Sequence, residues 1–132
     1  MSLIEKDYIM RLIYEVIRTL LRLIFHIDLD KKSGPLFEEE KYDECYETLK
    51  ELIDKGQIDE AENRLLDGMN IYERRDLELA LYFYAYLNEK DSDFLEEHDF
   101  SRREVAEGIK MVCKMFGYGS MAESLMDDID LD

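Results

Sequence analysis

The sequence predicts an all-α protein, folded as a single-domain bundle of five or six helices. Three observations favour this fold class. One proline and six glycines among 132 residues are too few for the many tight turns of a β-sandwich or barrel. Apolar side chains recur at spacings of three and four along each long segment, which is the period of an amphipathic helix. At this length, 46% hydrophobic residues are enough for one core.

The first predicted helix covers residues 4–27. Its apolar positions form one broad face at three-and-four spacing. Arg11, Arg18 and Arg22 fall within about 40° of one another on the opposite side of the helix. These three arginines, the basic ridge, could bind an acidic partner segment or an anion. They could also pair with carboxylates of the same chain, and we favour this second interpretation because surface ion pairs are common.

A turn and then a second helix follow. Residues 33–35 are Ser-Gly-Pro, and proline cannot continue a helix, so the sequence predicts a connection here. The second helix is expected over residues 37–54, where apolar side chains again recur at three and four. Gly56 is expected to end it in a left-handed conformation.

The third helix is expected to begin with Asp59 as N-cap and Glu62 three residues later, the spacing of a capping box. The same apolar spacing carries its inner face as far as Tyr72. We expect the break before the next helix at residues 73–76. A break at residues 68–70 is the alternative, because Gly-Met-Asn stands there.

The fourth helix is expected over residues 76–90. It is apolar nearly all round, which indicates either central burial or a second covered face such as a dimer contact. Tyr82, Tyr84 and Tyr86 alternate in a way that also suits a strand. The run is longer than a typical strand and has no partner strand elsewhere, so helix is preferred.

The C-terminal part has the clearest local pattern. Residues 91–99 are expected to form an acidic connection. Ser101 and Glu104 form a capping box for a fifth helix, which Gly117 should end. Ser120 opens a second, similar box for a short sixth helix, so that the C-terminal helices together span residues 76–129. The acidic tail after residue 127 should fray.

Residues 37–72 resemble a tetratricopeptide repeat, an antiparallel helix pair. Gly56 stands at the turn, Ala61 at the small position and Leu65 at the large one. Gly68 replaces the usual alanine, and no closing proline follows. Because one repeat cannot bury its own apolar face, the resemblance implies a TPR-like hairpin packed on other helices and not a repeat array.

The N-terminal string Asp-Tyr-Ile-Met-Arg, residues 7–11, carries a second resemblance. It looks like the opening of a family of small, uncharacterised bacterial proteins, found mainly in Firmicutes. In these proteins a long first helix precedes a helical pair of TPR-like character. The resemblance implies the fold and a bacterial origin, and it implies no activity.

The net negative charge of the chain makes some classes of binding partner unfavourable. With 17 basic and 33 acidic residues the net charge is −16, which repels nucleic acid and anionic membranes. Residues 1–27 carry a net charge of +1 and the rest of the chain −17.

Charged residues interrupt the first helix too often for a membrane span, and no secretory leader is expected. Cys45 and Cys113 lie on apolar stripes, where reduced thiols are usual, so we expect a cytoplasmic protein.

The loop after the first helix partly matches a calcium site. Asp28, Asp30 and Glu39 stand at positions one, three and twelve of an EF-hand loop. Position five is Lys32, a cation, and position six is Ser33 where glycine is needed. We therefore expect an acidic turn and no metal site.

The residue pattern does not indicate a catalytic site. His26 and His98 are the only histidines, and neither belongs to a ligand pair at helical spacing. Neither cysteine has a histidine adjacent in sequence, and no glycine loop suited to phosphate occurs. The sequence predicts no enzyme and no cofactor.

The leading function is therefore a non-catalytic helical module that binds a protein partner. A homodimer through the first or the fourth helix is one form of this function. The alternative is a protein that binds a metal or a small ligand through carboxylates between helices. The residues predicted to contact a partner are Arg11, Arg18, Arg22, Tyr82 and Tyr86.

Overall fold

The computed structural model describes residues 3–31, 37–127 and 129 of the chain. Seven helices and no β-strand occur in this described part, so the all-α, single-domain prediction is confirmed. The predicted turn at residues 33–35 and most of the predicted frayed tail lie outside it. The helices are α1 Leu3–Phe25, α2 Glu40–Asp54, α3 Ile58–Asp67, α4 Arg74–Glu89, α5 Ser92–Glu97, α6 Arg102–Met115 and α7 Gly119–Met126.

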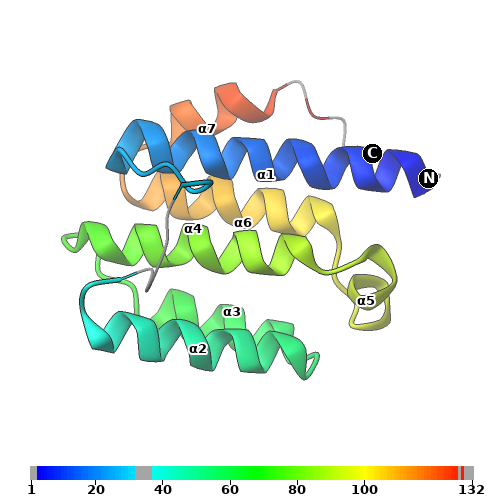
Figure 1. Cartoon of the computed structure of the whole chain (residues 1–132), viewed down its shortest axis with the longest axis horizontal. Coiled ribbons are helices and arrows are strands. Elements are labelled where there is room, and N and C mark those ends of the chain that lie inside the picture. Colours follow the sequence, from blue (N-terminus) through cyan, green and yellow to red (C-terminus); the bar gives the residue numbers. More distant parts are fainter. Residues whose placement is uncertain (1–2, 32–36, 128, 130–132) are drawn as a thin grey trace.

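Helix α4 is the central element of the bundle (Figure 1). Helices α1 and α6 pack on one side of it, α2 packs on the other with α3 alongside, and α7 packs against α1 and α6. Every residue of α4 from Leu77 to Leu87 is buried except Tyr86, which is half-buried. A helix covered on all sides needs apolar side chains all round, which explains the composition of α4. Its faces are used within the chain, and central burial is thus the interpretation that the structure supports; a homodimer through this helix stays an untested prediction.

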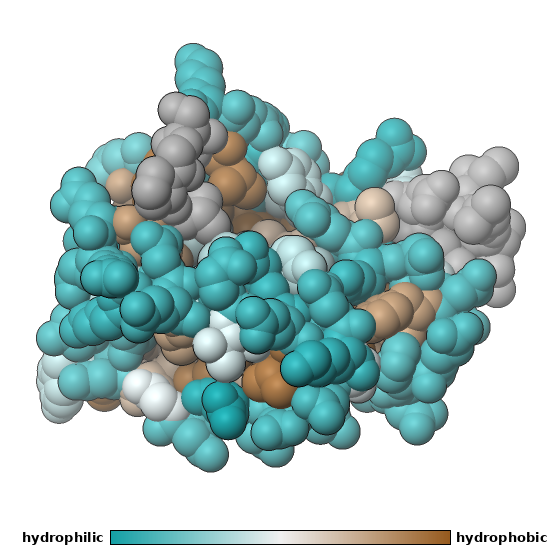
Figure 2. All heavy atoms as spheres, turned by 60° about the horizontal axis from the view of Figure 1, so that its bottom comes forward, coloured by the Kyte–Doolittle hydropathy of each residue, from teal (hydrophilic) through white to brown (hydrophobic). Residues whose placement is uncertain are grey.

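Helices α2 and α3 pack together and bury one face each. Leu49 and Ile53 of α2 and Ala61 and Leu65 of α3 are at most 3% exposed. Figure 2, in which the α2–α3 side of Figure 1 comes forward, shows a mostly hydrophilic surface with small, separated apolar patches. The pair occupies the place of the predicted TPR-like hairpin, and the relation to that repeat stays a prediction.

Hydrogen bonds from two tyrosine hydroxyls connect the central helix α4 to α2 and α3. Tyr84 donates to Glu62 Oε2 of α3 at 2.7 Å, and Tyr86 donates to Asp54 Oδ1 of α2 at 2.6 Å. Residues two apart in a helix point in nearly opposite directions. The alternating pattern that also suits a strand therefore lies on a helix, and its three tyrosines, Tyr82, Tyr84 and Tyr86, contact different neighbours.

The connection between α3 and α4 differs from the first prediction. Helix α3 ends at Asp67 with Gly68 as its C-cap, and α4 begins at Arg74. The alternative break at residues 68–70 is therefore confirmed for the end of α3. Tyr72, predicted on the inner face of the third helix, is 88% exposed. The apolar spacing continues past residue 68, although the backbone has already left the helix.

Local capping explains only some of the other helix ends. The N-caps of α2, α3, α4 and α7 make no side-chain hydrogen bond, and Asp59, predicted as an N-cap, lies inside α3, which begins at Ile58. Ser101 Oγ accepts the Glu104 N–H at 3.2 Å, as predicted for the capping box. Gly56 and Gly117 end their helices with φ of +82° and +89°, also as predicted. Helix α7, by contrast, begins at Gly119, so that Ser120 lies inside it and is not its N-cap.

Helix α5 occupies the segment that was predicted as an acidic connection. The side chain of Asp91 caps it by accepting the Phe94 N–H at 2.8 Å. Leu95 anchors the helix in the core at 1% exposure. Helix α2 is shorter than predicted, because it begins at Glu40 and not at residue 37.

Candidate interaction surface

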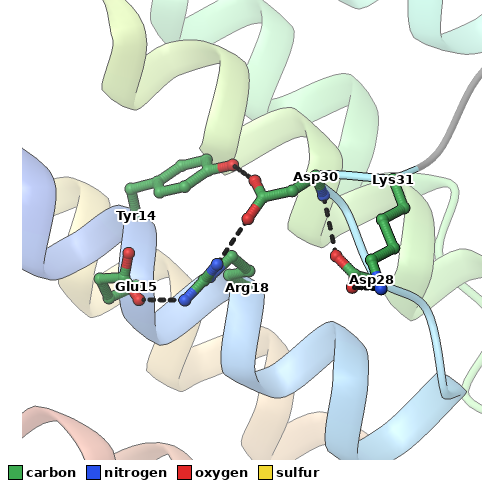
Figure 3. A network of polar contacts seen from close by, with 6 residues as sticks. All are labelled: Tyr14, Glu15, Arg18, Asp28, Asp30 and Lys31. Atoms are coloured by element: carbon green, nitrogen blue, oxygen red, sulfur yellow. Dashed lines mark hydrogen bonds and ion pairs between the residues drawn. The ribbon is translucent and has the colours of Figure 1, made fainter.

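The basic ridge on α1 is divided between two roles. Arg18 donates to Asp30 Oδ2 at 2.5 Å and to Glu15 Oε2 at 2.9 Å, as Figure 3 shows. This arginine thus pairs with its own chain, as the favoured interpretation predicts. Arg11 and Arg22 are exposed, and neither forms an ion pair with another side chain of the described segments. They stay candidate contacts for a partner.

Asp30 belongs to the same network and to the partial EF-hand pattern. It accepts the Tyr14 hydroxyl at 3.0 Å in addition to Arg18, and these hydrogen bonds, that of Arg18 first, lower its pKa. Asp28 accepts the backbone N–H of Asp30 at 3.1 Å. The Asp28 carboxylate is thus engaged within the loop, and the Asp30 carboxylate is engaged with helix α1. Across the described residues, no three potential ligands lie close enough together to hold a metal ion.

Tyr82 is not a surface residue. It is 2% exposed, and its ring packs against Phe37 at 5.3 Å and Tyr46 at 6.3 Å between centroids. Its hydroxyl donates to Glu78 Oε2 at 2.9 Å. The prediction that Tyr82 contacts a partner is therefore wrong, because the core of the chain encloses the side chain.

Tyr86 is half-buried and has neighbours of its own. The ammonium group of Lys90 lies 5.0 Å from the centre of its ring and that of Lys50 5.6 Å, both at cation–π distance. Its hydroxyl is bound to Asp54. The ring is thus part of the contact between α2 and α4, and only part of the side chain is open to a partner.

The most exposed apolar side chains of the α2–α4 half lie in the loop between α3 and α4. Tyr72 is 88% exposed and Ile71 51%. The backbone of this loop is nonetheless fixed. The Tyr72 N–H donates to Asn70 Oδ1 at 2.9 Å, and the Glu73 N–H donates to the Asn70 carbonyl at 3.0 Å. Two large apolar side chains are therefore held in solvent by an ordered turn.

Asp76, in the first turn of α4, ties this loop to helix α2. Its Oδ2 accepts the Asn70 N–H at 2.8 Å, and its Oδ1 accepts the Tyr42 hydroxyl at 2.7 Å. Burial and the hydrogen bond to Asp76 raise the pKa of Tyr42, so the hydroxyl stays a donor. One carboxylate thus joins two helices and the loop.

A groove of about 430 Å³ lies beside the loop, between α2, α3 and the start of α4. Apolar side chains of Leu65, Met69 and Leu79 line it together with charged groups such as Lys41 and Arg64. A partner segment that covers the loop would also reach this groove.

The apolar spacing predicted that Tyr72 lies in the core, but two other residues of the sequence indicated that it is exposed. Gly68 and Asn70 are turn-forming residues only two positions apart. They predict a loop that ends the helix, and hence an exposed Tyr72.

Comparisons with known proteins complete the description. No helix in the described part of the chain has the length and apolar character needed to cross a membrane. Searches among curated proteins and among solved structures gave no significant match. Residues 3–117, which include α1 to α6, match a protein family of unknown function. The chain therefore belongs to the DUF6483 family of unknown function.

Proposed function

We propose that this protein is a non-catalytic interaction module, and that the α3–α4 loop is its contact site for a protein partner. The observation that carries the proposal is the exposure of Ile71 and Tyr72 on a loop whose backbone is fixed by hydrogen bonds. Contact residues are often found on loops that a rigid scaffold positions.

The energetics favour such a contact. Tyrosine is enriched among the residues that dominate binding free energy in protein interfaces. Complete burial of a fully exposed large apolar side chain contributes about 1.5–3 kcal/mol. Tyr72 is close to that exposure, and Ile71, at 51%, would gain about half as much. Because Asp76 already fixes the loop, binding requires less ordering of the backbone than a mobile loop would require.

Charge indicates the kind of partner. Residues 38–67, which include α2 and α3, carry twelve acidic and four basic side chains, a net charge of −8 and half the charge of the chain. A partner surface with an apolar pocket surrounded by lysine and arginine would complement this region. A second copy of the chain would bring another charge of −16, and this repulsion disfavours a homodimer, including one through α1.

The chemistry of the cysteines supports a non-catalytic role. A nucleophilic cysteine needs a lowered pKa. Cys45 is exposed, but partial desolvation of its thiol and the nearby Asp76 charge raise its pKa; burial raises the pKa of Cys113 to about 12. Both are free thiols, which is compatible with the reducing cytoplasm that we propose as the location.

Site-specific photo-crosslinking tests the proposal. The photoreactive amino acid p-benzoylphenylalanine is placed at position 72 of the full chain, or at exposed position 107 of α6 as the control. We expect one discrete adduct from position 72 and none from position 107. The adduct should disappear when Ile71→Ser is added, although the melting temperature stays unchanged because Ile71 is exposed.

Two results would count against the proposal. Equal adducts from both positions would indicate random collision, and no adduct from position 72 would remove the loop as a contact site. An adduct with twice the mass of the chain would identify the partner as a second copy, against the charge argument.

A further inference from the structure

A second cavity, of about 270 Å³, lies where the end of α1, the start of α2 and the first turns of α4 meet. Aromatic rings and carboxylates together make up most of its wall. The aromatic residues are Phe25, Phe37 and Tyr42, and the acidic residues are Glu38, Glu39 and Glu78.

Glu78 is the buried acid of this cavity, at 1% exposure. Its Oε2 accepts the Tyr82 hydroxyl at 2.9 Å, and its Oε1 is paired with the Arg75 guanidinium. A buried carboxylate is stable only when it has such partners. The cavity thus already accommodates one guanidinium group, contributed by the chain itself.

The cavity is still negatively charged with Arg75 in place. Among the described residues, three carboxylates and one guanidinium line it, a net charge of −2. Lys41 lies 3.6 Å from Glu39, but both side chains are mostly exposed and this pair is weak. The C-terminal end of α1, which is the negative end of its dipole, also reaches the cavity at Phe25, and Arg74 donates to its Ile24 carbonyl at 2.7 Å.

The aromatic wall favours the same sign of charge. The rings of Phe37 and Tyr42 stack with their centroids 5.3 Å apart. Two cations of the chain already lie at cation–π distance from this wall: the Arg74 guanidinium is 5.2 Å from the centre of the Phe25 ring, and the Lys41 ammonium is 5.1 Å from that of Tyr42. Aromatic faces combined with carboxylates recognise organic cations, and a cavity of this size admits only a small group.

We propose that this cavity binds an organic cation, an alkylammonium or guanidinium group, beside Arg75 and against Glu38, Glu39 and the aromatic wall. The cation belongs either to a free amine or to a lysine or arginine side chain of another protein. This binding site is separate from the α3–α4 loop and does not depend on its function.

NMR titration of the full ¹⁵N-labelled chain at about 0.15 M ionic strength tests the proposal. The free probes are butylammonium and methylguanidinium, with butanol and methylurea as uncharged analogues. The peptide probes are acetyl-Gly-Lys-Gly-amide and acetyl-Gly-Arg-Gly-amide, with the glutamine peptide as control. We expect saturable shifts around Phe25, Phe37 and Tyr42 with the cations only. Tighter binding of the peptides assigns the site to a protein side chain, and tighter binding of the free cations assigns it to a small amine.

A pair of double variants separates local binding from general attraction to an acidic protein. Glu38→Gln with Glu39→Gln removes two carboxylates of the cavity, and both side chains are exposed, so the fold is kept. Glu44→Gln with Glu51→Gln makes the same change of charge on the outer face of α2. We expect affinity to fall about tenfold in the first variant.

The control variant should stay within about twofold of the wild type, since exposed charges outside the site are screened. Three results would overturn the proposal: no saturable shift with any cation, equal binding of the uncharged analogues, or equal loss in the two double variants.

Discussion

Gly108 of α6 allows a direct test of how α4 packs in the bundle. A Cβ atom at this position would lie 2.4 Å from Tyr84 Cζ and 2.5 Å from Tyr84 Cε1 and Oη. Tyr84 is fully buried, and its hydroxyl is held by Glu62 on α3. The ring therefore cannot move aside without loss of this hydrogen bond. We predict that Gly108→Ala destabilises the protein.

The expected magnitude follows from two opposing effects. In the interior of a helix, alanine is more favourable than glycine by about 1 kcal/mol. Overpacking of a core costs about 1–3 kcal/mol, and contacts as short as these indicate the upper end of that range. The free energy of unfolding should thus fall by about 2 kcal/mol, which lowers the melting temperature by on the order of 8 °C at this chain length.

Urea unfolding followed by circular dichroism measures the change. Gly68→Ala is the matched control, because the nearest atom to its added Cβ is 3.4 Å away, and its effect should stay within about 0.5 kcal/mol. In a Tyr84→Leu background the cost of Gly108→Ala should decrease, with a coupling energy of about 1 kcal/mol or more. A Gly108→Ala protein as stable as the wild type, or more stable, would refute this packing of Tyr84 on α6.

Three further predictions concern the loop, pH and the thiols. Asp76→Ala removes the acceptor of two hydrogen bonds and should lower the free energy of unfolding by about 2 kcal/mol in urea titrations; an unchanged value would contradict the role of this carboxylate. The hydrogen bond from Lys90, followed by that of a tyrosine, lowers the pKa of Asp54 below its ordinary 3.8. Its stabilisation is then present above pH 3.8 and lost as the pH falls through the folded-state pKa, so Asp54→Asn should lower the melting temperature at about pH 7 and leave it unchanged near pH 2. A maleimide should label Cys45 in the native protein and Cys113 only in denaturant, and two rapidly labelled thiols in the native state would argue against the buried position of Cys113.

Local patterns predicted much of the helical framework. Ser101 caps α6 because its hydroxyl lies three residues before the N–H that it accepts, a relation visible in the sequence. The apolar composition of residues 77–87 likewise indicated the central position of α4. Both inferences needed only neighbouring residues.

The interaction surface depends on contacts that sequence spacing does not record. The apolar spacing of α3 continues in the sequence from Leu65 to Tyr72. The backbone nevertheless leaves the helix, because hydrogen bonds to Asn70 and Asp76 hold the chain in a turn. Tyr82 faces the core because Phe37, 45 positions earlier, packs against it. Such long-range contacts decide which of several apolar side chains reaches solvent.

The central claim is that Ile71 and Tyr72 are presented by an ordered loop, and backbone ¹⁵N relaxation of residues 69–73 tests it most directly. We predict order parameters near 0.85 for these residues, about those of the adjoining helices. Values below about 0.6 would contradict the claim, because an apolar tip on a mobile loop has no preformed contact surface.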